Sequence, residues 1–224
     1  MFGRFERWFG NGALGIVDLL MTVFCVFLSL SIHEFAHGYA AHKMGDDTAK
    51  NMGRLNLSPL SHIDPIGAVC LFLFGFGWAK PVPVNYRNFG HKRYKLKMVV
   101  TSIAGPLSNL LLAFIGCVVF HVFAVIEVNT QLAFVLLSIT RTLAIMNVSL
   151  AVFNLIPIPP LDGSKILNAV LPARIYFRIM QYEQYGFIVL ILLLNFSPLR
   201  NFMSLIVQYI IYGYEWVIML LPFF

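Results

Sequence analysis

Long apolar stretches recur along this chain, each close to the length that crosses a lipid bilayer. A membrane-spanning helix needs about 20 mostly apolar residues, because the hydrocarbon core is about 30 Å thick. Only 12% of the residues are charged and 59% are hydrophobic, whereas a soluble domain has about 25% charged residues. We therefore expect an all-α, multi-pass integral membrane protein with about five or six spans, drawn from residues 13–32, 98–126, 131–156, 184–196 and 202–222.

The 224 residues are taken up by these spans and by tight connections, without a Ser/Gly linker, repeat or charge block that would mark a second domain. We expect a single membrane-embedded unit over residues 1–224. In chain order it comprises an interfacial amphipathic stretch (1–12), a first span (13–45), an irregular connection (46–97), core helices (98–163) and C-terminal helices (164–224). Arg4 and Arg7 before an apolar run also fit a signal peptide, but no small-residue cleavage site precedes residue 33, so we favour a retained helix.

The connection over residues 46–97 differs in kind from the spans, because Gly and Pro recur too often there for one long helix. Within it, Ala68–Phe74 is apolar but too short to cross a membrane as a helix. We expect two short extended pieces that form a membrane-embedded, β-hairpin-like segment. Non-helical backbone is tolerated at membrane depth only where it is buried in protein or lines a wet cavity, so this segment predicts a cleft.

The formal charge of +6 comes from basic residues that lie in loops beside the spans. They are not interleaved with aromatic residues in an RNA-binding pattern, so we expect no nucleic-acid partner. The connection after the first span carries a group of them, whereas residues 127–129 carry no positive charge. This group comprises Lys80, Arg87, Lys92, Arg93, Lys95 and Lys97. Because basic residues concentrate on the cytosolic side of membrane proteins, we expect the connections 46–97 and 160–183 to face the cytosol.

The polar cluster with the clearest chemical meaning is His33-Glu34-Phe35-Ala36-His37, which continues the first apolar stretch. On a helix, residues four apart lie about 40° apart on one face, so His33 and His37 can share one metal ion. Glu34 lies on the neighbouring face and can act as general base towards a water on that metal. A catalytic zinc site also needs a third protein ligand and an open position. Ionisable residues within a span are costly and indicate function.

Five segments, in order over residues 15–165, together resemble the site-2 protease family of intramembrane zinc metallopeptidases (peptidase family M50). The resemblance is to its compact subgroup, which has no inserted PDZ domain. A run of this HExxH type alone is only moderately specific, but its combination with a later Pro-Leu-Asp-Gly is highly specific. The segments are residues 33–37, Gly53–Gly67, Gly77–Asn85, Ala104–Asn109 and Asn154–Gly163.

This resemblance implies a site that binds one Zn²⁺. His33 and His37 would be the first two ligands and Asp162 the third. Glu34 would be the general base. Asn154, eight residues before Asp162, would be a catalytic group that holds the substrate backbone or the developing oxyanion. The prolines before Asp162 break the helix and allow its carboxylate to turn towards the metal.

Substrate-binding residues follow from the same resemblance. The family's extended segment, near residues 66–76 here, is thought to pair with an unwound substrate by strand addition. Ala68, Cys70 and Phe72 are therefore candidate substrate contacts. Asn109 is a further candidate, although the small residues of Gly105–Asn109 also fit a close contact between helices.

The function implied is an intramembrane zinc metalloendopeptidase that cleaves single-span membrane proteins in or near their transmembrane segments. Compact members of the family suggest a bacterial inner membrane, with the active site towards the cytosol; no oligomeric state is predicted. The alternative is a zinc-binding membrane transporter or sensor without hydrolytic activity. A transporter should offer polar residues along the whole path through the membrane, whereas this chain concentrates them at one depth. A non-ligating Glu34 beside the metal favours the hydrolase and argues against an inactive family member.

Overall fold

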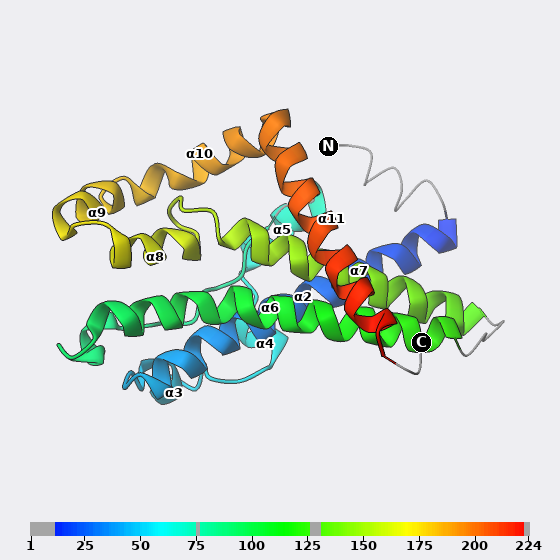
Figure 1. Cartoon of the computed structure of the whole chain (residues 1–224), viewed down its shortest axis with the longest axis horizontal. Helices are drawn as coiled ribbons and strands as arrows, with labels where there is room; N and C mark the ends of the chain where they lie inside the picture. The colour runs from blue at the N-terminus through cyan, green and yellow to red at the C-terminus, as the bar shows by residue number, and fades with distance from the viewer. Residues whose placement is uncertain (1–11, 75–76, 126–130, 222–224) are drawn as a thin grey trace.

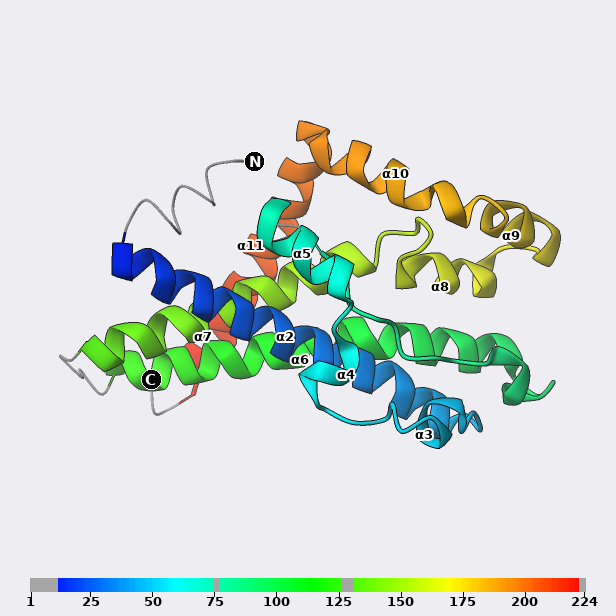
Figure 2. The same cartoon turned by 180° about the vertical axis from the view of Figure 1, so that it is seen from behind.

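The computed structural model describes residues 12–74, 77–125 and 131–221, and these residues form helices and loops without a β-strand. Three long helices lie side by side in both views (Figures 1 and 2): α2 (Gly12–Lys43), α6 (Tyr94–Val125) and α7 (Gln131–Asn154). Helix α6 runs antiparallel to the other two. Helix α11 (Ser197–Met219) crosses α7 at an angle. The interfacial stretch expected at residues 1–12 falls almost wholly outside the described residues.

Four helices in the described part of the chain are long and apolar enough to cross a membrane. They confirm a helical, multi-pass membrane protein, but the expected number of about five or six spans is not confirmed. The segment 184–196 forms helix α10 (Glu183–Asn195), whose 13 residues extend about 20 Å. That length is short of the hydrocarbon core. The four spans are Gly15–Lys43, Tyr94–Val125, Leu132–Asn154 and Ser197–Met219.

Small and polar residues fill the contacts between the long helices. A Cβ atom on Gly116 of α6 would lie 3.2 Å from the Thr140 carbonyl oxygen of α7. The buried amide of Asn147 on α7 donates to Ser29 Oγ on α2 over 2.7 Å. In a membrane, small residues allow helices to approach closely, and hydrogen bonds between side chains hold them together. These contacts fix α2, α6 and α7 as the frame of the site.

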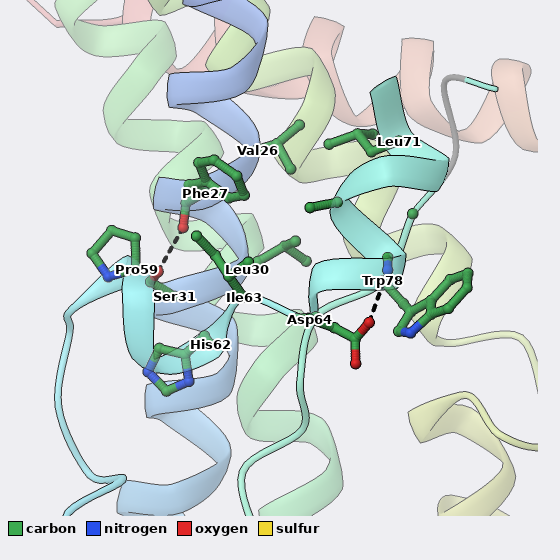
Figure 3. A pocket seen from close by; sticks show the side chains of 14 residues that line it. Val26, Phe27, Leu30, Ser31, Pro59, His62, Ile63, Asp64, Leu71 and Trp78 are labelled. Carbon is green, nitrogen blue, oxygen red and sulfur yellow. Dashed lines mark hydrogen bonds between the residues drawn. The ribbon is translucent and has the colours of Figure 1, made fainter. Parts of the chain in front are cut away.

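The expected β-hairpin-like segment is wrong for the described residues, because Pro65–Phe74 forms helix α5. Asp64 Oδ1 accepts from the Gly67 N–H over 2.8 Å at the start of the helix, as Figure 3 shows. A helix satisfies its own backbone hydrogen bonds, so a short apolar segment at membrane depth needs no partner strand. Among the described residues, the only β-type pairing is an isolated antiparallel bridge between Ile63 and Ala79.

Helix α5 packs beside the middle of α2. Leu71 points towards Val26 across a small cavity of about 30 Å³, which Phe27 and Leu30 also line (Figure 3). Leu30, which lines this cavity, precedes His33 by about one turn of α2.

Shorter elements surround the C-terminal end of α2 and the N-terminal end of α6. They include α3 (Thr48–Asn51), α4 (Pro59–His62), the 3-10 turn η1 (Tyr86–Phe89), α8 (Asp162–Val170) and α9 (Ala173–Met180). Residues 77–85, here called the strap, precede η1 and have no regular secondary structure apart from the bridge at Ala79.

Buried Asp46 joins the strap to the end of α2. Its carboxylate accepts from the Asn85 N–H over 2.7 Å, from Asn88 Nδ2 over 2.6 Å and from Thr48. Burial alone would raise the pKa of the Asp46 carboxyl, but these hydrogen bonds hold it below its usual range.

Candidate metal centre

Three potential metal ligands from two distant helices meet at one point. His33 and His37 lie one turn apart on α2, and Asp162 is the first residue of α8. His37 Nε2 lies 3.0 Å from His33 Nε2 and 3.0 Å from Asp162 Oδ2. His33 Nε2 lies 3.2 Å from the same Oδ2 atom. All three residues are buried.

The geometry of this triangle fits zinc. Zinc binds imidazole nitrogen at about 2.0–2.1 Å and carboxylate oxygen at about 2.0–2.2 Å, so the donors of a tetrahedral site stand about 3.3 Å apart. The three observed edges, 3.0 to 3.2 Å, come close to that value. Two histidines and one carboxylate form a ligand set typical of hydrolytic zinc enzymes, and a fourth position remains for water or substrate.

The partners of the two imidazoles place their protons on the side away from the metal. His37 Nδ1 lies 2.7 Å from the Thr101 carbonyl oxygen, which can only accept a hydrogen bond. His33 Nδ1 lies 2.9 Å from Asn109 Oδ1, another acceptor. Each Nδ1 therefore donates, and in a neutral imidazole Nε2 keeps its lone pair for a metal. Such second contacts fix the orientation of metal ligands.

Gly105 of α6 gives the histidines the room that they occupy. A Cβ atom at Gly105 would lie 2.3 Å from His37 Nε2 and 2.6 Å from His33 Cε1. No side chain at this position is compatible with the observed imidazoles. The close helix contact that the small residues predict is therefore made at the metal site itself.

Asp162 reaches the site because α8 begins tightly against the end of α7. A Cβ atom on Gly163 would lie 2.3 Å from the Leu155 carbonyl oxygen, so glycine permits this approach. Lys165 Nζ lies 3.5 Å from the second carboxylate oxygen. This ammonium group favours the charged carboxylate, which is the form that binds a metal.

Glu34 is half-buried on the neighbouring face of α2. Its Oε2 atom accepts a hydrogen bond from the Val82 N–H of the strap over 2.8 Å. Asn154 is the last residue of α7 and is half-buried. Its amide makes no hydrogen bond to the residues that the structure describes.

The structure places the substrate-binding candidates differently from the sequence-based expectation. Ala68, Cys70 and Phe72 belong to helix α5, not to an extended edge that could pair with a substrate strand. Asn109 is completely buried and contacts His33. It therefore lies behind a candidate metal ligand, and its role as a substrate contact stays a prediction.

Sequence reasoning missed two groups near the site, and it missed the contact that a third, Asn109, makes with His33. The contact between Asn109 and His33 joins residues 76 positions apart, and the only local signal was an Asn within an apolar helix. Lys165 follows Asp162 by one helical turn, a spacing that the sequence does show. The Val82 N–H belongs to the backbone, so no side-chain pattern signals it.

Comparison with known proteins agrees with this geometry. The family model for peptidase family M50 matches residues 118–194, which include Asp162. YwhC of Bacillus subtilis is 43% identical over 186 residues, which make up 80% of this chain and 82% of YwhC. Rip2 of Mycolicibacterium smegmatis is 30% identical over 198 residues, or 84% of this chain and 71% of Rip2. No solved structure matches this chain.

A more distant relative, MJ0392 of Methanocaldococcus jannaschii, is 28% identical over 149 residues, which are 66% of this chain and 34% of that protein. YwhC, Rip2 and MJ0392 are all named as zinc metalloproteases. The identity to YwhC extends over most of both chains, so it relates the whole molecule and not one motif. This chain therefore belongs to peptidase family M50, the site-2 protease family, and is a zinc metalloprotease.

Proposed function

We propose that this zinc metalloprotease is an endopeptidase that cleaves single-span membrane proteins in or near their transmembrane segments, within the bilayer. The observation that carries the proposal is the depth of the site. His33 and His37 lie inside the candidate span Gly15–Lys43, and His33 precedes its end by ten residues, or about 15 Å of helix. A peptide bond that reaches these residues would enter this candidate span.

The proposed roles of the residues follow from their chemistry. His33, His37 and Asp162 would hold Zn²⁺. When bound, zinc acts as a Lewis acid that polarises a carbonyl and lowers the pKa of a coordinated water to about 7. Glu34 accepts a proton from the attacking water and delivers it to the leaving amide nitrogen. Asn154 donates a hydrogen bond to the carbonyl oxygen as negative charge develops on it.

The whole chain is proposed to act as one membrane-embedded unit in a bacterial cytoplasmic membrane. Residues near the site end of α2 and α6 are rich in positive charge, which supports a site towards the cytosol. Two of the relatives, YwhC and Rip2, come from bacteria. A zinc transporter or sensor is not favoured, because the relatives are named as proteases.

The test is cleavage of single-span reporter proteins in liposomes that also contain the purified protease. We expect wild type to cleave the embedded reporter, and Glu34→Gln to retain zinc but lose at least about a hundredfold in rate. A soluble, unfolded peptide with the same cleavage sequence serves as the comparison. If only the soluble peptide is cleaved, the intramembrane proposal is wrong. If Glu34→Gln cleaves as well as wild type, Glu34 is not the general base.

A further inference from the structure

The carboxylate of Glu34 is held by a main-chain donor from a distant part of the chain. The Val82 N–H donates to Glu34 Oε2 over 2.8 Å, and the two residues are 48 positions apart. The side chain of Val82 is itself buried, with 6% of its surface exposed. This contact involves no metal ligand, yet it fixes the residue next to His33.

Val82 carries the only backbone N–H group among residues 81–83 of the strap, because its two neighbours are prolines. Val82 lies between Pro81 and Pro83, and proline has no backbone N–H. Residues 81–83 therefore offer one donor, and it is used on Glu34. Pro83 also restricts Val82 to an extended conformation. The donor is thus presented by a stiff segment that loses little conformational entropy when it binds the carboxylate.

Contacts on both sides of Val82 set the position of the strap. The Lys80 N–H donates to the His62 carbonyl oxygen over 2.8 Å. The Arg54 guanidinium donates to the carbonyl oxygens of Lys80, over 3.0 Å, and Pro81, over 3.3 Å. Beyond Val82, the Asn85 N–H binds Asp46 Oδ2 over 2.7 Å. The strap is therefore fixed independently of Glu34.

Gly38 lets the strap approach α2 on the face that carries Glu34. Gly38 follows Glu34 by four residues, so both lie on one face of the helix. A Cβ atom at Gly38 would lie 2.9 Å from Val82 Cγ1 and 3.1 Å from Leu55 Cδ1. The chain thus keeps the space that the Val82–Glu34 hydrogen bond requires.

We propose that the Val82 N–H positions the general base of this enzyme. By binding Oε2, it holds the Glu34 side chain in one orientation and leaves Oε1, which has no hydrogen bond to the described residues, to accept the proton. Without this donor the side chain would sample several rotamers, and misplacement of a catalytic group slows the reaction. The inference rests on the proposed function, because it assumes that Glu34 is the proton acceptor.

Two substitutions of the same residue separate the N–H from the side chain. Val82→Pro removes the donor, and the extended backbone before Pro83 can accept proline. Val82→Ala keeps the donor and removes most of the side chain that packs on Gly38. We expect Val82→Pro to bind zinc and to keep the KM of Val82→Ala, while its kcat falls about tenfold to a hundredfold, as for loss of a hydrogen bond to a charged group. Val82→Ala is the reference for this comparison, because it retains the donor and lacks the valine side chain.

The outcomes that overturn the inference are distinct. Equal kcat in the two variants shows that the N–H has no role in the reaction. Loss of bound zinc in Val82→Pro alone shows that the strap supports the fold of the site and not Glu34 in particular.

A spectroscopic measurement tests the inference even if the enzyme cleaves no reporter, in which case the proposed function itself fails. The infrared band of the Glu34 carboxylate is obtained as the difference between each Val82 variant and the same variant that also carries Glu34→Gln. We expect this band to shift between Val82→Ala and Val82→Pro, because only the former retains the hydrogen bond. An identical band in both variants overturns the inference.

Discussion

Gly105 lies directly against the imidazole of His37: a single methyl group on Gly105 would stand 2.3 Å from His37 Nε2, the atom that faces Asp162. Real Cβ atoms do not approach other atoms so closely, so α6 or the imidazole would have to move by about 1 Å. The three ligand atoms lie only 3.0 to 3.2 Å apart. A displacement of that size would break the triangle of candidate metal ligands.

Gly105→Ala should therefore abolish stable zinc binding and lower the rate of cleavage about a hundredfold or more. The measurement is zinc content of the purified variant by mass spectrometry, together with its rate. Gly213→Ala is the matched control, because a Cβ atom at Gly213 on α11 meets no atom within 4 Å. That change should leave zinc bound and stabilise the helix slightly. Full zinc occupancy in Gly105→Ala would contradict the geometry of the site.

Removal of the Asn109 side chain should weaken zinc binding, because Asn109 Oδ1 accepts from His33 Nδ1 over 2.9 Å. Loss of such a partner typically costs about 10–100-fold in metal affinity. We expect this loss in Asn109→Ala, measured by competition with a chelator of known affinity. Asn109→Asp keeps an acceptor oxygen at the same place and should bind zinc more tightly than Asn109→Ala. Equal affinities for the two variants would show that the hydrogen bond does not orient His33.

The sequence alone predicts the helical frame well. The apolar stretches 13–32, 98–126 and 131–156 lie largely in α2, α6 and α7, apart from one or two residues at the ends of the last two. It fails where a short apolar run can be either strand or helix. Ala68–Phe74 is such a run, and capping by Asp64 makes it helical. Residues 184–196 are apolar enough to suggest a span, but α10 has only 13 residues and is too short to cross the hydrocarbon core.

Only part of the candidate metal site could be predicted from local sequence patterns. The pairing of His33 with His37 follows from helical spacing, because both residues lie on one helix. The meeting with Asp162, 125 positions from His37, depends on how three helices pack, and only the resemblance to a known family suggested it. The roles of Asn109 and Val82 depend on contacts between distant segments, which neither hydropathy nor local spacing encodes.

Asp46 should contribute stability that is present near neutral pH and lost in acid. Its folded-state pKa lies below the usual value of about 3.9, so this contribution is fully present above about pH 4 and disappears as pH falls through the lower, folded-state pKa. Asp46→Asn should be less stable by about 1–3 kcal/mol at pH 7, and the difference should shrink in acid. Unfolding in detergent, with a chelator present throughout, measures it. Asp47→Asn, at the exposed neighbouring position, should show no comparable loss of stability. If the difference in stability between Asp46→Asn and wild type does not change with pH, the depressed pKa of Asp46 is contradicted.

Removal of the metal should destabilise the protein, because the candidate ligands come from α2 and α8, so that a bound zinc ion would join the two helices. A metal that binds only the folded state adds about 2.7 kcal/mol when its free concentration is 100 times Kd. We expect a chelator to lower the thermal midpoint in detergent by about 5 °C or more, and added zinc to restore it. In Asp162→Ala the chelator should have little effect. A midpoint of wild type that does not respond to zinc removal would argue against a site that links the two helices.

X-ray absorption at the zinc edge of the purified wild-type protein tests the central claim most directly. If His33, His37 and Asp162 hold the metal, the spectrum should show only nitrogen and oxygen neighbours at about 2.0–2.2 Å, with the scattering pattern of two imidazoles. A sulfur neighbour at about 2.3 Å, which Cys25, Cys70 or Cys117 would have to supply, or a spectrum with one imidazole or none, would contradict the account.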